Sequence, residues 1–377
     1  MKARRQILPL LIAGIAAPAP AAAQELLPVN LYVANIDDAG GLVRIGQPQK
    51  LTGDRGVSSQ PAFTPDGKSV LFIGRRDSAN AQSDVYRIDL GSGAETRVTT
   101  TPENENSPTV THDGHLMVIR WVPATLFTEW GPWLYDMRGN PVRGVLPGPD
   151  TVGYYVQVDS TTFAMVRPRS PSHVAIFDTR SGSMTDRDAP VANLPPQLIP
   201  GQRAVSYTLT DSLGRNVIRK LDIASGSITT IGPAVLSRVA HAWTPRGVLL
   251  MGKGNRILAM TPGRDTVWRQ VAAFEDPELQ NITTYVVSPK GDKVILISPV
   301  KPPLHTLIRD AIQSGSNVAE ALATYRDAPQ ETVLKKYDVD RGGLRALTAE
   351  VQRRSTDDAA AIETLTMRLL GPEAPRQ

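Results

Sequence analysis

The fold of this chain is decided by residues 60–99, which read QPAFTPDGKSVLFIGRRDSANAQSDVYRIDLGSGAETRVT. Short apolar runs at 61–63, 68–74, 84–89 and 95–99 predict four strands. Pro65, Asp66 and Gly67 predict a tight turn between the first two strands, because proline presets φ and glycine accepts a positive φ. A single four-stranded sheet leaves both apolar faces in water, so we expect it to stack on similar sheets.

Similar glycine turns recur along the chain at intervals of 41 to 47 residues. They lie at 64–67, 111–114, 199–201, 244–247 and 288–291, with a degenerate copy at 158–160. Propeller blades repeat at about 40–50 residues, so the spacing is typical of a propeller. Most of the third strands that follow these turns end in aspartate and a second glycine turn, as a hairpin requires.

The last copy is incomplete, because only two strands, 283–287 and 293–298, follow its position in the chain. The missing pair lies at the other end, where 31–36 predicts a third strand and 42–52 a turn and a fourth. Antiparallel pairing of 31–36 with 293–298 would build one blade from both ends and remove the open sheet edges. We therefore expect an all-β fold: a six-bladed β-propeller with a composite N/C-terminal closing blade, plus a small C-terminal α-helical tail.

The repeat resembles those of TolB-like propellers. Residues 60–99 match P-x-x-[ST]-P-D-G, then a hydrophobic run, then [IV]-Y-x-x-[DN], and the resemblance covers about 31–298. It implies a propeller fold of the kind found in the Tol–Pal translocation propeller and in the propellers that cap prolyl-oligopeptidase-type peptidases. The printed sequence has no G-x-S-x-G motif, so the resemblance does not extend to a serine nucleophile.

Beyond the repeats, Pro299, Pro302 and Pro303 predict a stiff linker, and the apolar period then becomes helical. We expect two helical hairpins, 303–327 and 341–370, with a capping box at 317–320. The fragment A-L-A-x-Y-R at 321–326, followed by Y-D-V-D at 337–340, resembles tetratricopeptide-like tails. A generic helical tail packed on the propeller is the open alternative.

Residues 1–23 predict a signal peptide, with basic residues at 2, 4 and 5, an apolar stretch at 7–17 and three alanines before Gln24. The apolar stretch is shorter than the roughly 20 residues of a spanning helix. The Arg4-Arg5 pair leaves a twin-arginine export route open beside the Sec route. We expect a propeller at 24–298, a linker and helical tail at 299–377, and a periplasmic or secreted protein without membrane insertion after cleavage.

Composition excludes several classes of function. Residues 1–23 hold three of the 41 basic residues and none of the 37 acidic ones, so the remainder is close to neutral. This balance gives no reason to expect a nucleic-acid partner. The chain has no cysteine, which excludes disulfides, thiol catalysis and thiolate metal sites. No phosphate-binding glycine loop precedes a helix, and we expect no cofactor and a monomer.

In a propeller of this connectivity, the loops between second and third strands share one face with the links between blades. Trp121, Trp130 and Trp133, three of the five tryptophans, lie beside such a loop. Amphipathic aromatics next to charged groups suit a protein, peptide or glycan partner, although Trp121 and Trp133 also fit a core between blades. The predicted ligand-binding residues are Arg75, Arg76, Asp77, Glu103, Glu105, Glu129 and Trp130.

His112 and His115 have the H-x-x-H spacing of metal ligands, but they lie in a turn on the opposite face with no third ligand nearby. Adjacent acids elsewhere, such as Asp37 and Asp38, lie in turns or at helix starts. We therefore predict no metal site and no catalytic residue.

These observations favour a non-catalytic periplasmic binding or scaffold protein in the cell envelope. Two alternatives stay open: an enzyme acting on a glycan or peptide in the central funnel, and a sensor or accessory subunit of an envelope or export machine. The alternatives differ in whether acidic or histidine side chains converge at the mouth of the ring.

Overall fold

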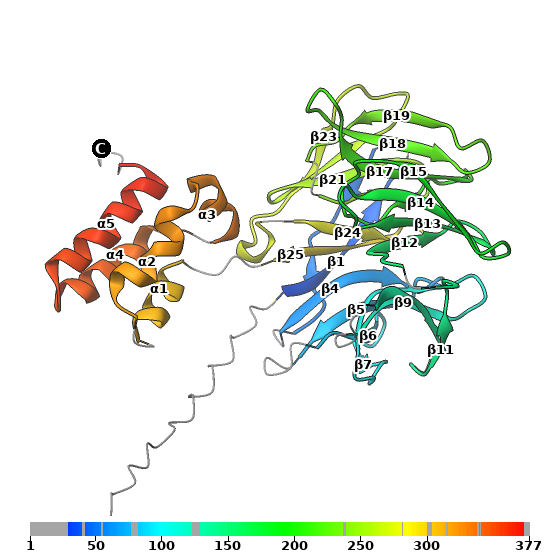
Figure 1. The fold of residues 1–377 in the computed structure, drawn as a ribbon. Helices are drawn as coiled ribbons and strands as arrows, with labels where there is room; N and C mark the ends of the chain where they lie inside the picture. Colours follow the sequence, from blue (N-terminus) through cyan, green and yellow to red (C-terminus); the bar gives the residue numbers. More distant parts are fainter. Residues whose placement is uncertain are drawn as a thin grey trace, which may run out of the picture.

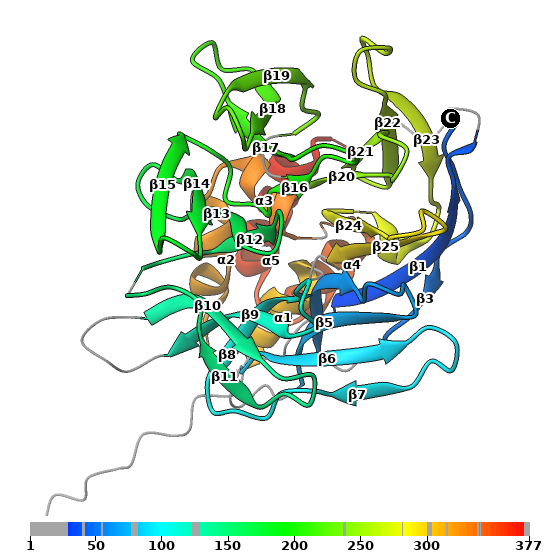
Figure 2. The same ribbon diagram turned by 90° about the vertical axis from the view of Figure 1, so that its right-hand side faces the viewer.

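The chain forms a ring of β-sheets followed by helices (Figure 1). The computed structural model describes residues 29–39, 42–53, 56–76, 82–122, 129–148, 150–236, 239–280, 282–299, 304–313, 316–337, 339 and 341–372. Viewed face-on, the sheets surround a common centre, and the helices lie on one side of the ring (Figure 2). The protein therefore has an all-β, propeller-like fold with C-terminal helices, and none of the helices in the described ranges is long and apolar enough to cross a membrane.

Four of the sheets are antiparallel and have four strands each. The first contains β8 (Asn104–Val110), β9 (Leu116–Val122), β10 (Glu129–Tyr135) and β11 (Pro141–Gly144). The second contains β12 (Tyr154–Gln157), β13 (Thr162–Arg167), β14 (His173–Asp178) and β15 (Ser183–Asp188). The third contains β16 (Gln197–Leu198), β17 (Ala204–Thr210), β18 (Asn216–Asp222) and β19 (Ile228–Pro233). The fourth contains β20 (His241–Trp243), β21 (Leu249–Lys253), β22 (Arg256–Met260) and β23 (Arg269–Ala273), and a short 3-10 helix, η2 (Pro277–Leu279), follows it.

The remaining nine strands form one sheet. The 60–99 repeat supplies β4 (Val57–Phe63), β5 (Ser69–Arg75), β6 (Asp84–Asp89) and β7 (Glu95–Arg97). The two chain ends supply β24 (Thr284–Val287), β25 (Lys293–Pro299), β1 (Val29–Asp37), β2 (Arg44–Ile45) and β3 (Gln49–Lys50). The two groups meet at a single parallel residue pair, Val29 of β1 and Val57 of β4. The four strands of the repeat are present as predicted, except that β4 starts four residues earlier, β5 is shifted by one residue and β7 ends two residues earlier.

The ends of the strand region pair with each other as predicted. β1 runs antiparallel to β25 over seven residue pairs, from Val29 opposite Pro299 to Asn35 opposite Lys293. The predicted outer strand at 42–52 is present as two short pieces, β2 and β3, which both pair with β1. The closing sheet is therefore built from residues at both ends of the ring.

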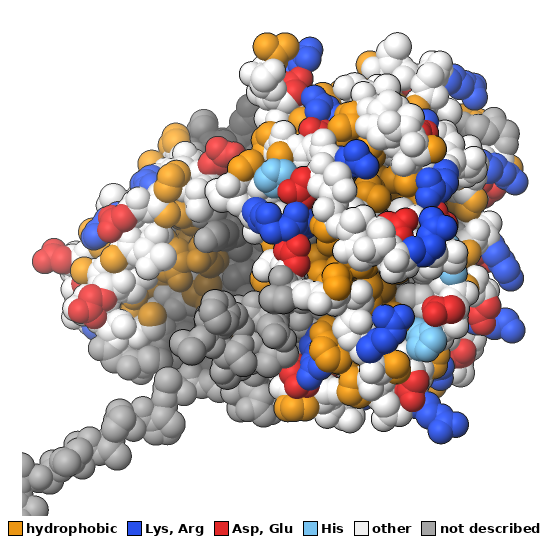
Figure 3. All heavy atoms as spheres, turned by 45° about the vertical axis from the view of Figure 1, so that its right-hand side comes forward, with side chains coloured by type: hydrophobic (Ala, Val, Ile, Leu, Met, Phe, Trp, Pro, Cys, Tyr) orange, Lys and Arg blue, Asp and Glu red, His pale blue; other side chains and the backbone are white. Residues whose placement is uncertain are grey.

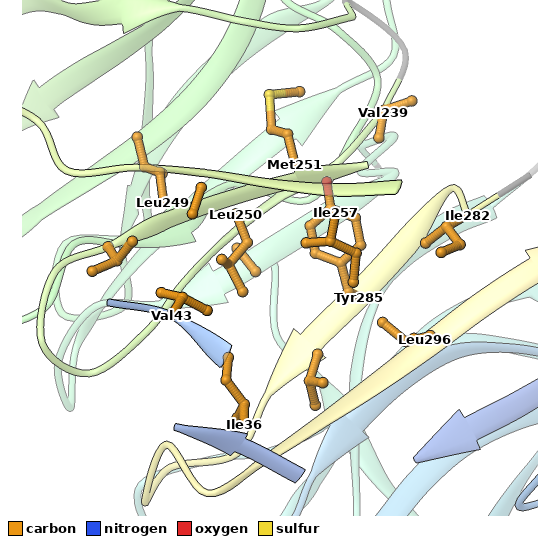
Figure 4. Close-up of a cluster of buried hydrophobic side chains, with 14 of the residues drawn as sticks. Ile36, Val43, Val239, Leu249, Leu250, Met251, Ile257, Ile282, Tyr285 and Leu296 are labelled. Carbon is orange, nitrogen blue, oxygen red and sulfur yellow. The ribbon is translucent and has the colours of Figure 1, made fainter. Parts of the chain in front are cut away.

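Neighbouring sheets interlock through buried apolar side chains. In one such core, Ile36, Val43 and Leu296 of the closing sheet lie beside side chains of β21 and β22 (Figure 4). The hydroxyl of Tyr285 accepts from Gly252 N at 2.6 Å and donates to the carbonyl of Ala240. The buried side chain of Tyr285 in β24 thus bonds to the backbone of the neighbouring sheet, at β21 and just before β20, and its hydroxyl would be costly to bury without these partners.

The tail folds around a core of its own. It contains α1 (Leu304–Gln313), α2 (Val318–Asp327), α3 (Gln330–Lys336), α4 (Arg341–Gln352) and α5 (Thr356–Leu370). All buried members of this core come from the helices, including Leu304, Ile308, Leu322, Val333, Leu344, Leu347, Ile362 and Leu369. The capping box is present, with Glu320 N donating to Asn317 Oδ1 at 2.9 Å. α3 was not predicted, because it is too short to show an apolar period and places one side chain, Val333, in the core.

Candidate binding face of the ring

The ends of β5 and β9 lie on the ring face that also carries the connections between sheets. Arg75 at the end of β5 is paired with the first residue of β4, and Trp121 near the end of β9 with the first residue of β8. The side-chain amide of Gln82 donates to Glu103 O at 2.9 Å, which ties the β5–β6 connection to the link before β8. We call this surface, with Arg75, Glu103, Trp121 and Trp130, the link face.

The two predicted arginines have different environments. Arg75 is exposed, whereas Arg76 turns inward and donates to Val57 O at 3.0 Å and Ser58 Oγ at 3.2 Å. Arg76 also pairs with Glu95 at 3.1 Å, and its guanidinium lies 4.8 Å from the ring centre of Tyr86. These contacts make Arg76 a support for the strands below the link face. Asp77, the third predicted residue of this loop, lies outside the described residues.

Glu103 lies in the link before β8 and forms an ion pair with Arg120 of β9. Burial acts to raise the pKa of Glu103, but the hydrogen bond and charge of Arg120 outweigh it and leave the pKa lowered. The guanidinium of Arg120 lies 4.4 Å from the ring centre of Trp133, within range of a cation–π interaction. Glu103, Arg120 and Trp133 therefore form one connected cluster, and Trp133 belongs to the core between sheets.

Glu105 is fully buried, with an exposed fraction of 0%. Its carboxyl accepts hydrogen bonds from Thr99 Oγ1 at 3.0 Å, from Tyr135 OH at 3.1 Å and from Thr101 Oγ1. Burial raises the pKa of Glu105 to about 7, because the hydroxyl donors compensate only part of the lost hydration. Glu105 lies beneath the link face, so it does not offer its carboxyl to solvent.

Trp121 and Trp130 form the exposed aromatic feature of the link face. They lie directly opposite each other on β9 and β10, and each is 37% exposed. Directly opposed residues of an antiparallel pair share one face of the sheet, so the two indoles are neighbours. Glu129 precedes Trp130 at the start of β10, and its side chain lies outside what the structure describes.

A second group beside the tryptophans was not predicted. Val152 N donates to Trp130 O at 3.0 Å, which brings the link before β12 against β10. In that link Asp150 pairs with Arg167 at 2.7 Å and with the half-exposed Arg169 at 3.3 Å. The sequence did hold a signal, since arginine recurs within two residues of the end of the second strand, at Arg76, Arg120 and Arg167.

Charges of both signs are scattered over the ring surface, without a continuous area of one sign on the face shown (Figure 3). A shallow cavity of about 260 Å³ lies beside β1 and β3, and its lining is apolar, amide or lysine in character, with Asn35, Gln49 and Lys293 among its residues. The lining residues include no acid and no histidine, so the cavity offers no acid–base pair.

The histidine pair predicted to be structural lies in the turn between β8 and β9, where His115 Nδ1 is 3.2 Å from Asp113 Oδ2. Within the described ranges, no group of three or more acids and histidines gathers in a way that could hold a metal ion. The contact of His115 with Asp113 thus lies within this turn.

Ser206 and His241 form a pair that resembles a nucleophile and its base. His241 Nε2 lies 2.7 Å from Ser206 Oγ, but both residues are buried and Trp243 donates to the same Oγ at 2.8 Å. Burial lowers the pKa of His241 to about 4, so its imidazole is neutral at ordinary pH. With no access for a substrate, the pair acts as a polar contact between sheets.

The fold is similar to that of TolB propellers. The chain aligns over 73% of its length with 99% of a structure assigned as TolB from Agrobacterium tumefaciens, at a TM-score of 0.52 and 16% identity. It aligns over 72% of its length with 98% of a chain of a nidogen/laminin complex, at a TM-score of 0.50 and 11% identity. TolB from Acinetobacter baumannii aligns at a TM-score of 0.45 and 15% identity, over 72% of this chain and 64% of that one. Comparison of the sequence with family models and with curated proteins gives no match.

These similarities confirm the expected resemblance to TolB-like propellers as a matter of fold. At 11 to 16% identity they carry no information about the partner or activity of this chain. Function must therefore be argued from the link face itself.

Proposed function

We propose that this chain is a non-catalytic binding protein of the cell envelope, which uses the link face to hold a peptide segment of a protein partner. The observation that carries the proposal is the exposed, directly opposed pair Trp121 and Trp130. Tryptophan is the residue most enriched among binding hot spots, because it offers a large apolar area and one N–H donor. A folded monomer rarely exposes two such side chains side by side without a partner.

The surroundings of the pair fit a peptide. Half-exposed Arg169 lies in an adjoining connection, where it pairs with Asp150 at 3.3 Å, and its remaining donors can pair with the polar groups of an extended chain laid over the indoles. Arg75 adds an exposed cation on the same face. The predicted site residues Asp77, Glu103, Glu105, Glu129 and Arg76 remain part of the proposal, with Arg76 and Glu105 acting as supports from below.

The experiment is a selection of peptides from a random library displayed on phage, followed by measurement of each Kd by calorimetry on the full mature chain. Trp121→Ala and Trp130→Ala should each weaken the selected peptides by about tenfold or more, equal to about 1.4 kcal/mol. Met137→Ala is the matched control, because Met137 is an exposed hydrophobic residue in the turn at the other end of β10. Peptides that bind equally well to both tryptophan variants would place the site elsewhere.

Binding rather than catalysis is supported by the state of the acids near the link face. Glu103 pairs with Arg120, Asp150 with Arg167, and Glu105 is buried. A general acid or base needs a side chain within reach of the substrate. Peptide and glycoside hydrolysis assays with the purified protein test this point, and turnover abolished by Glu103→Gln would favour the enzyme alternative.

We further infer that the ring has six blades, with the nine-stranded sheet counted as two. Support comes from the single pair that joins the two parts, Val29 and Val57. The strands β24, β4 and β8 contact one another in order, as do β16, β20 and β24, in the manner of inner strands around a channel. A crystal structure of 24–298 with a different number of inner strands would overturn this count.

The proposal also includes the location of the protein in the cell and its domain boundaries. Residues 1–23 are cleaved on export, 24–298 form the ring, 299–377 form the linker and helical tail, and the product is a periplasmic or secreted monomer. The separate core of the helices supports the second boundary. N-terminal sequencing of the exported protein tests the first, and a start at Met1 in a membrane fraction would contradict it.

A further inference from the structure

Glu105 occupies a buried position between two sheets where an acid is not required by the fold. Its counterpart 47 residues earlier is Ser58 of β4, and its counterpart 47 residues later is Val152, and both are fully buried. The hydroxyl beside it recurs too, because Thr52 Oγ1 accepts from Leu31 N at 3.0 Å and Thr99 Oγ1 accepts from Val85 N at 2.8 Å. Thr52, the counterpart of Thr99 in the adjoining repeat, thus accepts the same kind of backbone hydrogen bond where the position of Glu105 is taken by Ser58.

Three hydroxyl groups surround the Glu105 carboxyl. Thr99 and Thr101 belong to the link at 98–103, and Tyr135 belongs to β10. An ionised carboxylate accepts from all three, whereas a protonated carboxyl must donate to one of them. The protonation state therefore decides which way the hydrogen bonds of this link point.

The charged groups around Glu105 come from every element packed against it. Asp84 of β6 repels a negative charge at Glu105, and it is itself paired with Arg97 of β7 at 2.8 Å. The other titratable groups are Glu103 of the link, Arg120 of β9 and Tyr135 of β10. Arg97 and Arg120 are each paired with another acid, so burial and the charge of Asp84 raise the pKa of Glu105 to about 7.

The link that Glu105 holds leads directly to the tryptophan pair. Glu103 of the link pairs with Arg120, which is the residue opposite Glu105 in the β8–β9 ladder. Arg120 immediately precedes Trp121, and Trp121 lies opposite Trp130. One ion pair and one strand therefore connect the link to the indoles.

We propose that Glu105 is a positioning residue for the link face, and that its proton makes the tryptophan site pH dependent. The protonated carboxyl holds the link at 98–103 against β8 and β10. Ionisation turns all three hydroxyls toward the carboxylate, but it also leaves a buried charge beside Asp84 that no cation in the described ranges pairs with directly. This charge draws in water and loosens the link, so that the peptide site weakens as pH rises through neutrality. The binding part of this inference rests on the proposed function, whereas the movement of the link does not.

The coupling is tested without any ligand by tryptophan emission of the full mature chain between about pH 5 and pH 9. The wild type should show a transition with its midpoint near pH 7, and Glu105→Gln, which copies the neutral form, should lack it. Glu105→Ser copies the neighbouring repeat and should lack it too. Trp121→Phe with Trp130→Phe should remove the signal change, which separates these indoles from Trp133, Trp243 and Trp268.

Glu105→Gln leaves every other titratable group in place, so the comparison of this variant with the wild type isolates the contribution of Glu105. A transition that persists in Glu105→Gln overturns the proposal. Carboxyl carbon NMR of the wild type with labelled glutamate measures the same proton without any variant, and a midpoint at the ordinary value near 4.5 also overturns it.

The binding part is tested with a selected peptide that requires Trp130. Its affinity for the wild type should fall at least threefold from about pH 6 to pH 8, and its affinity for Glu105→Gln should stay constant. If no peptide depends on the tryptophans, the proposed function fails while the emission experiment still decides the coupling. If the peptide binds equally at both pH values, the proton does not reach the site.

Discussion

Asn35 of β1 and Lys293 of β25 lie opposite each other, with the Lys293 ammonium 3.4 Å from the Asn35 side-chain oxygen. One residue lies near the start of the ring and the other near its end. Ile36 N donates to Asp292 O at 3.0 Å, so the adjoining pair Asn35–Lys293 is of the kind without mutual backbone hydrogen bonds, where side chains lie closest.

Asn35→Cys with Lys293→Cys should therefore form a disulfide under mild oxidation. The chain has no native cysteine to compete, and the bridge would close a loop of nearly the whole ring. Stabilisation of about 2–5 kcal/mol is expected from the entropy removed from the unfolded chain. Mass spectrometry detects the bridge, and urea unfolding measures the gain.

The control moves one cysteine two positions out of register, as Asp37→Cys with Lys293→Cys. This pair should crosslink slowly and give no gain in stability. Equal crosslinking of both pairs would show that the closing strands do not hold the register seen here.

The pairing of the two chain ends could be predicted because residues 31–36 and 293–298 each show a strand pattern of their own. Only their pairing with each other had to be inferred. The buried position of Glu105 was not predicted. Ser107 in β8 adopts a positive φ of 51° and lies in an irregular stretch where the ladder register shifts between Asn106 and Thr109. An extra residue in a strand reverses the alternation of faces. Its signal in the sequence is the proline after Ser107, which matches Pro61 after Gln60 in β4, where φ is also 51° and the register also shifts.

The exposed Trp121 also went against the simpler interpretation. Its strand reads L-M-V-I-R-W-V, which is apolar at every position except Arg120, so the pattern alone fits a buried tryptophan. Exposure is decided at the strand end, where β9 and β10 reach the link face and Trp121 keeps 37% of its surface exposed. Which strand ends are covered depends on tertiary packing, which a single sequence does not encode locally.

Arg76→Met should lower stability by about 1–3 kcal/mol, since it removes partly buried hydrogen bonds to Val57 and Ser58 and the pair with Glu95. Arg75→Met is the matched control, because Arg75 is the preceding residue and its side chain is exposed. Its effect on the free energy of unfolding should stay within about 0.5 kcal/mol. Urea unfolding measures both. Equal effects would mean that the inward contacts of Arg76 are absent in solution.

Gly74→Ala should destabilise the same strand. A methyl group at Gly74 would lie 2.5 Å from the ring of Tyr86, which also contacts Arg76 and Phe72. Relief requires movement of a packed ring, at a cost of about 1–3 kcal/mol. Gly93→Ala is not a suitable control because of its positive φ, whereas Gly148→Ala has open space around it and should be neutral. A neutral Gly74→Ala would show that the ring moves freely.

Removal of the chain after Pro299 should leave the ring folded, because the helical core contains no ring residue among its buried members. Thermal unfolding of 24–299 should show one transition within a few degrees of the transition of the ring in the full chain. Residues 304–372, expressed alone, should melt cooperatively, since five short helices that share a core are stable where single ones are not. An insoluble truncated ring would show that the helices cover its apolar surface.

The free energy of unfolding of the whole protein should depend on pH through Glu105, and the raised pKa of this residue sets the sign of that dependence. The pKa of Glu105 is about 7 in the folded chain, against an ordinary value of 4.5 when unfolded. Below about pH 4.5 both states hold the proton and the residue contributes nothing. As pH rises from 4.5 to 7, the unfolded chain releases its proton first, so the free energy of unfolding falls by about 3 kcal/mol and then stays level.

Glu105→Gln removes this dependence, so its stability relative to the wild type should rise across pH 4.5 to 7 and reach a plateau of about 3 kcal/mol above pH 7, less the cost of any hydrogen bond that the amide cannot make. Urea unfolding at a series of pH values measures the difference between the two proteins. Other acids affect both proteins equally and cancel in that difference. Asp159 is an example: burial acts to raise its pKa, but backbone donors and Arg203 outweigh burial and leave the pKa lowered. A difference curve that is flat, or that falls as pH rises, would show that Glu105 has an ordinary or lowered pKa in the folded chain. The seam between β6, β8 and β10 would then admit water.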